Sequence, residues 1–261
     1  MKVFHILPIL MVCSLGIACD SAERQTAETT QPEARVEQGY LEIDGGRLYY
    51  EVAGTGEPVV LIHGNTLDLR MWDDQFQSLS QSFRIIRYDV RGFGKSSLPV
   101  EGEPYSHHED LAALLGHLGI LKAHIVGLSM GSGIAVDFVV GHPAMSRSLV
   151  AAGPWVFGHS SPAASELVAV FAEAAAALKQ EGVEAALDSM YAAPLVTEST
   201  RDTAVLQRMR EIASDYSFWH LSHSDPQTVL QLSSLERLAE ISVPTLVVVG
   251  VRELTACREA G

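Results

Sequence analysis

The apolar residues of this chain form short unbroken runs that alternate with longer stretches of helical spacing. Two runs near the start, 40–43 and 47–52, flank Asp44-Gly45-Gly46 and predict two strands joined by a tight turn. Further strands are predicted at 59–62, 83–88, 123–128, 147–152 and 245–249. The continuous apolar run at 59–62 is typical of a strand that is buried on both faces of a sheet.

Apolar residues at intervals of three and four predict helices between these strands. The predicted helices lie at 70–79, 105–118 and 132–140. Strands that alternate with helices after an opening hairpin predict an α/β fold, with an open, mostly parallel sheet and helices on both of its faces.

The stretch from about 155 to 235 interrupts this alternation. It is rich in Ala, Leu and Glu, and its helical spacing predicts helices at 163–179, 182–191, 201–213 and 226–238. We interpret it as a helical cap inserted into one sheet domain that covers residues 39–261.

The N-terminal segment has the features of a targeting signal. Residues 1–18 contain Lys2 followed by a nearly unbroken apolar stretch, which is too short for a transmembrane helix. The segment ends in Leu15-Gly16-Ile17-Ala18-Cys19 and resembles a bacterial lipoprotein signal, in which Cys19 is lipidated and becomes the first residue of the mature chain. A cleaved secretory signal is the alternative, and either one predicts export. The polar residues 19–38 predict a flexible tether.

Charge and cysteine content exclude several kinds of partner. The formal net charge of −14 argues against nucleic acid and against an anionic membrane surface as electrostatic partners. Cys13 lies in the signal segment and Cys19 is committed to the lipid, so Cys257 is the only thiol left and no intramolecular disulfide is expected in the mature chain. Adjacent residues point apart, so His107-His108 is a poor chelate and is expected at the solvated start of a helix. No metal or organic cofactor is expected, and the sequence does not predict the oligomeric state.

The segment Gly127-Leu128-Ser129-Met130-Gly131 carries the clearest chemical signal. It lies between the predicted strand 123–128 and the predicted helix 132–140, which is the setting that exposes a nucleophilic serine on a strained turn. Glycines on both sides allow the strand and the helix to approach closely. The N-terminus of the following helix directs backbone N–H groups toward a developing oxyanion.

Taken together, residues 39–261 resemble the α/β-hydrolase family. The motifs that carry the resemblance occur in the family's order: His63-Gly64-Asn65, Asp89–Ser97, Gly127–Gly131 and Val243-Pro244-Thr245. The chain is similar to the small capped esterases, lactonases and haloperoxidase-like members of this family. The resemblance implies that Asp89–Ser97 is a structural turn at the rim of the active site.

The resemblance also implies a role for individual residues. Ser129 corresponds to the nucleophile, and the backbone N–H groups of Met130 and Asn65 correspond to the oxyanion hole. The catalytic acid corresponds to Glu253, three residues after Gly250. In this family the histidine of the first motif more often braces its loop, so His63 is not expected to be the base.

The resemblance places the catalytic histidine after the acid. Eight residues follow Glu253 in the sequence, and none of them is histidine. We therefore expect that the family's last strand and helix are missing from this sequence, which would be truncated or partial. His220 and His223, in the predicted cap, are possible substitutes for the missing base.

The sequence therefore predicts an exported serine hydrolase that cleaves a small or medium carboxylic ester or lactone through an acyl-enzyme. Serine at position 129 argues against epoxide hydrolase and haloalkane dehalogenase chemistry, which needs a carboxylate there. Perhydrolysis and acyl transfer stay open because they use the same residues. The alternative is a catalytically impaired relative that serves as a binding remnant. Trp155 and Trp219 are expected to wall the substrate pocket.

Overall fold

The computed structural model describes residues 35–159, 162–199, 202–230 and 233–250. The predicted signal segment, most of the predicted tether, Cys19, Glu253 and Cys257 lie outside the described residues.

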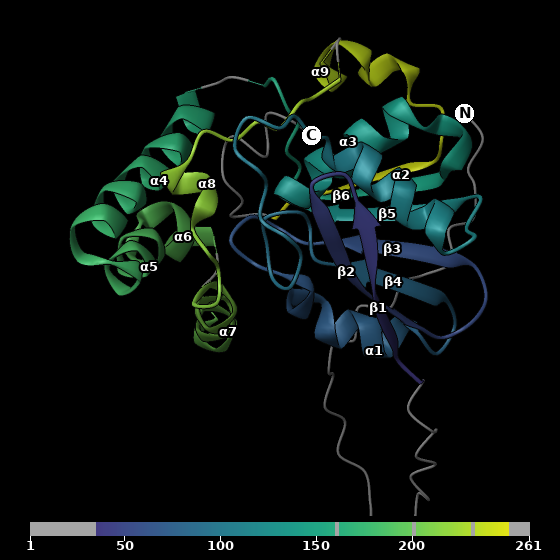
Figure 1. Ribbon diagram of the computed structural model, residues 1–261, viewed down its shortest axis with the longest axis horizontal. Helices are drawn as coiled ribbons and strands as arrows, with labels where there is room; N and C mark the ends of the chain where they lie inside the picture. Colours follow the sequence, from purple (N-terminus) through teal and green to yellow (C-terminus); the bar gives the residue numbers. More distant parts are fainter. Residues whose placement is uncertain (1–34, 160–161, 200–201, 231–232, 251–261) are drawn as a thin grey trace, which may run out of the picture. The chain divides into compact units, whose positions relative to one another are not determined.

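The described part of the chain is organised around a seven-stranded sheet (Figure 1). Its strands are β1 (Glu37–Ile43), β2 (Gly46–Ala53), β3 (Pro58–Ile62), β4 (Arg84–Tyr88), β5 (Ala123–Leu128), β6 (Ser146–Ala152) and β7 (Thr245–Val248). They lie side by side in the order β1-β2-β4-β3-β5-β6-β7. β1 and β2 form an antiparallel hairpin, β2 is antiparallel to β4, and the neighbours from β4 to β7 are parallel. The predicted mostly parallel sheet is therefore confirmed.

The sheet is covered on both faces, and the central strand β3 is apolar at every position. The helices involved are the 3₁₀ turn η1 (Leu69–Trp72), α1 (Asp73–Leu79), α2 (His107–His117) and α3 (Met130–Gly141). In β3, Val60 and Ile62 pack in one cluster with residues of α2 and α3, whereas Val59 and Leu61 pack in another with residues of η1 and α1. This alternation follows from the two-residue repeat of a strand.

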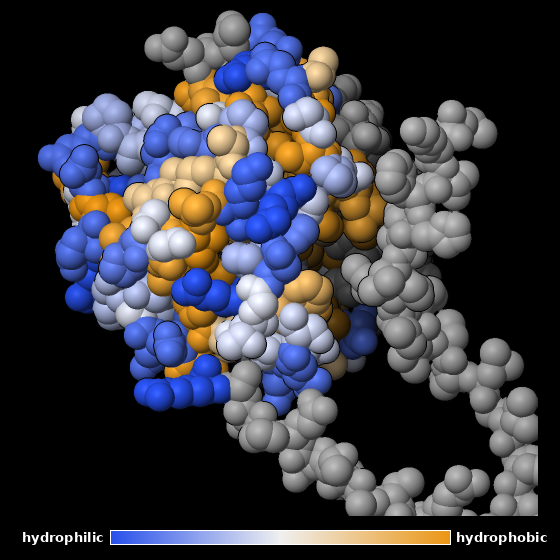
Figure 2. Space-filling view, turned by 90° about the vertical axis from the view of Figure 1, so that its right-hand side faces the viewer, coloured by the Kyte–Doolittle hydropathy of each residue, from blue (hydrophilic) through white to orange (hydrophobic). Residues whose placement is uncertain are grey.

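Helices α4 to α8 lie in the stretch that we interpret as a cap, and Figure 1 shows them gathered together. They are α4 (Pro162–Glu181), α5 (Val183–Ala192), α6 (Pro194–Ser199), α7 (Thr203–Ala213) and α8 (Trp219–Ser222). Among the described residues no helix is both long and apolar enough to cross a lipid bilayer. Figure 2 shows one face of the molecule, on which hydrophilic and apolar residues are interspersed.

The predicted helix at 226–238 is wrong over most of its length. Helical structure there is limited to α9 (Ser234–Arg237) and the 3₁₀ turn η3 (Leu238–Glu240). Upstream, the backbone N–H of Thr228 donates to the carbonyl oxygen of Tyr105 over 2.7 Å, and Gln227 forms a parallel bridge with Tyr105. Pairing with a distant segment has therefore overridden the local helical spacing.

Ion pairs attach cap helix α7 and the loop after it to the core. Arg70, in η1, binds Asp215 at 2.8 Å and the neighbouring Asp68 at 2.7 Å. Arg208, in α7, binds Asp73 at the start of α1. Most of these groups are partly exposed, so each pair contributes modestly to stability. Together they fix the position of the cap relative to η1 and α1.

The turn between β5 and α3 requires glycine at two positions. A Cβ atom on Gly127 would overlap with the carbonyl oxygen of Gly131, and one on Gly131 would overlap with the carbonyl oxygen of Ile62. The start of α3 is thus pressed against the ends of β5 and β3. This close approach determines the position of Ser129, which lies between the two glycines.

His63 joins the loops that follow β3 and β4. Its Nδ1 lies 2.8 Å from the carbonyl oxygen of Gly64, and the backbone N–H of Val90 donates to its Nε2 over 2.9 Å. The ring is therefore neutral, with its proton on Nδ1. Burial lowers the pKa of His63 to about 4. The geometry agrees with the bracing role expected from the sequence, because both ring nitrogens are occupied by the backbone.

The glycine contacts predict a contrast between two substitutions. Gly127→Ala is expected to destabilise the protein by about 3 kcal/mol or more, because the new methyl group meets backbone that cannot move aside. Gly116→Ala, in α2 with open space around it, is expected to stabilise by about 0.5–1 kcal/mol. Urea unfolding of both variants measures the contrast. Equal stabilities of Gly127→Ala and the wild type would contradict the close packing.

The pKa of His63 predicts that this residue destabilises the fold in acid. As the pH falls, the unfolded chain is protonated near pH 6.5 and the folded protein only near pH 4, so stability is lost between these values. The difference corresponds to about 3 kcal/mol. Burial raises the pKa values of Asp89 and Asp137 to about 7. Protonation of these two carboxyl groups therefore adds stability as the pH falls, which is opposite to the effect of His63. Because these effects overlap in the stability of the whole protein, the protonation of His63 is measured directly by NMR of its ring nitrogens. The ring should stay neutral at pH 5.5. Protonation of the ring at pH 5.5 would contradict the two backbone hydrogen bonds by which His63 joins the loops.

Candidate active site

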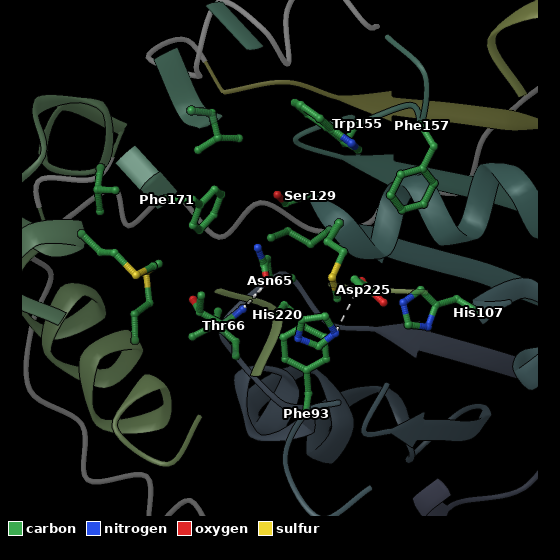
Figure 3. A pocket seen from close by; sticks show the side chains of 18 of the residues that line it. Asn65, Thr66, Phe93, His107, Ser129, Trp155, Phe157, Phe171, His220 and Asp225 are labelled. Carbon is green, nitrogen blue, oxygen red and sulfur yellow. Dashed lines mark hydrogen bonds and ion pairs between the residues drawn. The ribbon is translucent and has the colours of Figure 1, made fainter. Parts of the chain in front are cut away.

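A cavity of about 430 Å³ lies at the carboxyl ends of β3, β4 and β5, where the cap contributes the rest of its wall. Parallel sheets commonly bind ligands at this edge. The loop after β3 contributes Gly64–Leu67, the turn after β5 contributes Leu128–Met130, and the loop after β6 contributes Trp155 and Phe157. Figure 3 shows these groups around the cavity, with the side chain of Ser129 directed into it.

Ser129 has a strained backbone conformation at the tip of the turn, with φ of 53° and ψ of −117°. This is an unfavourable region for a residue with a side chain, and such strain is concentrated at functional sites. The turn is held by the backbone N–H of Ser129, which donates to the carbonyl oxygen of Ala152 over 2.9 Å. Among the described residues, no hydrogen-bond partner of the Ser129 hydroxyl is found. The geometry is that of an exposed nucleophile on a strand–turn–helix.

Ser132 ties this turn to the loop after β6. Its hydroxyl donates to the carbonyl oxygen of Ser129 over 2.6 Å and accepts the backbone N–H of Trp155 over 2.7 Å. The side chain is buried. Ser132 therefore couples the position of Ser129 to that of Trp155, a residue of the cavity wall.

The two residues that the sequence assigns to the oxyanion hole both line the cavity beside Ser129. Met130 is the first residue of α3, so its N–H has no partner inside the helix. Asn65 lies in the loop after β3, where its side-chain oxygen accepts the N–H of Thr66 over 2.9 Å. Asn65, Ser129 and Met130 thus line the same cavity, and the assignment of Asn65 and Met130 to an oxyanion hole stays a prediction.

The turn Asp89–Ser97 supports the rim of the cavity, in agreement with the structural role expected for it. The Asp89 carboxylate accepts the backbone N–H groups of Leu69 and Lys95 at 2.9 and 2.8 Å. Within the same turn, Phe93 lines the cavity and stacks on His220, with ring centroids 4.8 Å apart. No pattern in the sequence marked Phe93 as a cavity residue.

The two tryptophans expected in the pocket are placed differently. Trp155 lines the cavity. Trp219 is buried at the start of α8, where its ring stacks on His223 with centroids 4.9 Å apart, and it is not among the residues that line the cavity. The apolar wall comes instead mainly from Phe171, Met190 and other cap residues. Of the two cap histidines considered as bases, His220 faces the cavity and His223 does not.

The expectation that His107 and His108 lie at a solvated helix start is wrong. They begin α2, but both side chains are buried. His107 lines the cavity, and its Nδ1 has no hydrogen-bond partner among the described residues. Burial lowers the pKa of His107 well below its ordinary value, so the ring is neutral at pH 7.

One group in the described part of the chain has the spacing of a metal site, and it lies at the junction of α2 and α3. His108 Nδ1 is 3.3 Å from His142 Nε2, and both atoms are 3.5 Å from a carboxylate oxygen of Glu109. Ligands of a tetrahedral ion lie about 3.3 Å apart. The same distances also fit a hydrogen-bonded cluster, and the Glu109 side chain is 63% exposed. We assign no ion to this group.

Comparisons with known proteins agree with the fold. The family model described as alpha/beta hydrolase fold matches residues 57–250. A hydrolase from Pseudomonas aeruginosa PA01 is similar in structure, with a TM-score of 0.68 and 28% identity over 85% of this chain and 84% of that chain. The enol-lactonase from Burkholderia xenovorans LB400 has a TM-score of 0.65 and 25% identity over 85% and 86%.

Matches to curated sequences are shorter. A non-heme haloperoxidase from Rhodococcus erythropolis is 36% identical over 103 residues, which is 39% of this chain and 38% of the relative. The chain thus spans less than two fifths of the length of this relative. The matched region runs from the start of β3 to the end of β7, so it excludes the β1–β2 hairpin and includes Asn65, Ser129 and Met130. The chain belongs to the alpha/beta hydrolase fold family.

Proposed function

We propose that this protein is a serine hydrolase that cleaves a small or medium carboxylic ester or lactone through an acyl-enzyme. The observation that carries the proposal is the strained Ser129, which lines the same cavity as Asn65 and Met130. Acyl transfer needs these two features, a positioned nucleophile and donors for the oxyanion.

In the proposed reaction the Ser129 oxygen attacks the carbonyl carbon of the ester while a base takes the hydroxyl proton. The carbonyl oxygen becomes an oxyanion that accepts the N–H groups of Asn65 and Met130. The C–O bond to the alcohol then breaks, and the alcohol leaves with the proton. Water attacks the acyl-enzyme by the same route and releases the carboxylic acid. Glu253 is proposed to orient the base, as the family resemblance implies.

The cavity and the structural neighbours support a substrate of modest size. A volume of about 430 Å³ is within the usual range of small-molecule sites. Aromatic and aliphatic side chains form much of its wall, which suits an acyl chain. The similar enol-lactonase from Burkholderia xenovorans supports lactones as candidates beside open-chain esters. Serine at position 129, in place of a carboxylate, favours acyl transfer over epoxide opening.

The second candidate is a catalytically impaired hydrolase that binds its ligand without turnover. It is favoured by the Ser129 hydroxyl, for which the described residues provide no hydrogen-bonded base. The two candidates make different predictions for the reactivity of Ser129. A hydroxyl activated by a base reacts rapidly with a fluorophosphonate, whereas one without a base reacts slowly.

We further propose that the protein is exported and anchored to a membrane through a lipidated Cys19. The support is the lipoprotein-like sequence before Cys19 and the polar stretch 20–38 after it. Stable anchoring takes more than one lipid chain, and a triacylated cysteine would meet this need.

Ser129→Ala is expected to abolish fluorophosphonate labelling and to lower kcat/KM for short-chain esters by at least about 10³-fold, because the nucleophile is lost. Ser148→Ala is the matched control, since the Ser148 hydroxyl pairs with His124, near the amino end of β5, and does not line the cavity. Labelling rates and ester hydrolysis measure both variants.

The two candidate functions are distinguished by the rate at which the fluorophosphonate labels Ser129 in the wild-type protein. Rapid labelling at Ser129 with ester turnover supports the hydrolase. Labelling no faster than that of denatured protein would contradict it and leave the impaired relative.

Cys19→Ser is expected to prevent membrane retention. A bacterial host that expresses the full sequence is supplied with a clickable palmitate analogue, and the label should be found in the wild-type protein and absent from the variant. Cys257→Ser is the control and should keep the label. Unlabelled wild-type protein in the soluble exported fraction would favour a cleaved secretory signal instead.

A further inference from the structure

One corner of the cavity is polar, in contrast to its apolar cap wall. His107 at the start of α2, His220 in α8 and Asp225 in the loop after α8 meet there. Figure 3 shows the three side chains close together beneath Ser129. None of them belongs to the nucleophile, the oxyanion hole or the proposed acid. The corner therefore calls for an explanation of its own.

The Asp225 carboxylate is held by one of its two oxygens. Oδ1 accepts the hydroxyl of Tyr105 over 2.9 Å and the backbone N–H of Gln227 over 3.1 Å. Oδ2 has no hydrogen bond within the described parts of the chain, and it lies 3.9 Å from Nε2 of His220. The first oxygen thus fixes the carboxylate, and the second stays available as an acceptor.

His220 presents a donor to the same space. Its ring stacks on Phe93, and its Nδ1 lies 2.9 Å from the hydroxyl of Tyr216. Burial raises the pKa of Tyr216, so this hydroxyl stays protonated and can donate to Nδ1. The proton of the neutral ring then lies on Nε2, which is the arrangement that the nearby Asp225 carboxylate favours. Nε2 is buried and has no hydrogen-bond partner among the described residues.

The separation of these two atoms defines the group that fits between them. A distance of 3.9 Å is too long for a hydrogen bond, but one oxygen atom can lie about 2.8 Å from both atoms. A hydroxyl group can accept the Nε2–H of His220 and donate to Oδ2 of Asp225 at the same time. An ammonium group fits less well, because it carries only N–H donors and one of them would face the Nε2–H donor of His220. The unpaired Nδ1 of His107 adds a further polar atom to the corner.

We propose that His220 and Asp225 form a hydroxyl-binding subsite, and that the substrate is an ester or lactone with a free hydroxyl group away from the reacting carbonyl. Tyr216 is a positioning residue, since it acts through the ring of His220. The substrate class rests on the proposed function, but the binding of a hydroxyl group does not, so the two are tested separately.

The first test measures binding with Ser129→Ala protein, which leaves esters intact. Methyl hexanoate, its 3-hydroxy and 6-hydroxy derivatives and methyl 6-aminohexanoate are titrated and followed by NMR. At least one hydroxy ester is expected to bind about tenfold more tightly than methyl hexanoate, the effect of one hydrogen-bonded group in a buried site. Equal affinities of all hydroxy esters and methyl hexanoate, or tightest binding of the amino ester, would overturn the proposal.

The second test repeats the titration in variants made in the Ser129→Ala background. Asp225→Asn keeps the shape of the side chain but replaces the free acceptor by a donor, and Tyr216→Phe removes the hydroxyl that sets the proton on His220. Both are expected to reduce the preference for the hydroxy ester to about twofold or less. The matched control is Asp215→Asn, a cap aspartate that binds Arg70 and does not line the cavity. Asp215→Asn should keep the full preference.

A preference that survives in both Asp225→Asn and Tyr216→Phe would overturn the assignment to this corner. The result is independent of turnover, because Ser129 is absent from every protein measured. Failure of wild-type labelling would refute the proposed hydrolase and leave the subsite intact. Failure of the binding preference would refute the subsite and leave the hydrolase intact.

Discussion

The close approach of α3 to the ends of β3 and β5 is the constraint on which the site depends. Gly127 and Gly131 make it possible, because any side chain at either position would overlap with backbone. The approach forces Ser129 into a strained conformation and leaves the N–H of Met130 at the free end of a helix. It also brings the loop that carries Asn65 beside the turn. The proposed nucleophile and the proposed oxyanion donors are therefore placed by backbone packing, which is more rigid than side-chain contacts.

The second level of organisation is polar and joins the loops to one another. His63 joins the loops after β3 and β4 by two backbone hydrogen bonds. Ser132 connects the turn between β5 and α3 to the loop after β6. Both side chains are buried, where an unmade hydrogen bond would be costly. Such contacts order the loops around the cavity without taking part in the chemistry. They explain why a histidine beside the active site can be unsuited to act as a base.

The spacing of apolar residues and glycines allowed the sheet, the first three helices and the turn between β5 and α3 to be predicted from the sequence. Each of these features is encoded within about 5–20 consecutive residues, by apolar period or by glycine spacing. The polar corner could not be predicted in this way, because His107, His220 and Asp225 come from separate segments and meet only in the folded chain. The burial of His107 and the orientation of Trp219 likewise depend on tertiary packing. The irregular segment around Thr228 was missed because it pairs with Tyr105, more than a hundred residues away in sequence.

The contrast between the two sides of the cavity bears on specificity. An apolar wall distinguishes poorly between acyl chains that differ by one methylene group, whereas a buried polar group rejects a ligand that leaves it unpaired. Nε2 of His220 is such a group, since it is buried and Tyr216 occupies the other nitrogen of its ring. It lies 3.9 Å from Oδ2 of Asp225, whose other oxygen is held by Tyr105 and Gln227. A ligand without a matching group would bury these atoms without a partner. The cap can therefore provide apolar binding and polar selection in one cavity, and Ser129 would act on whichever acyl group satisfies both.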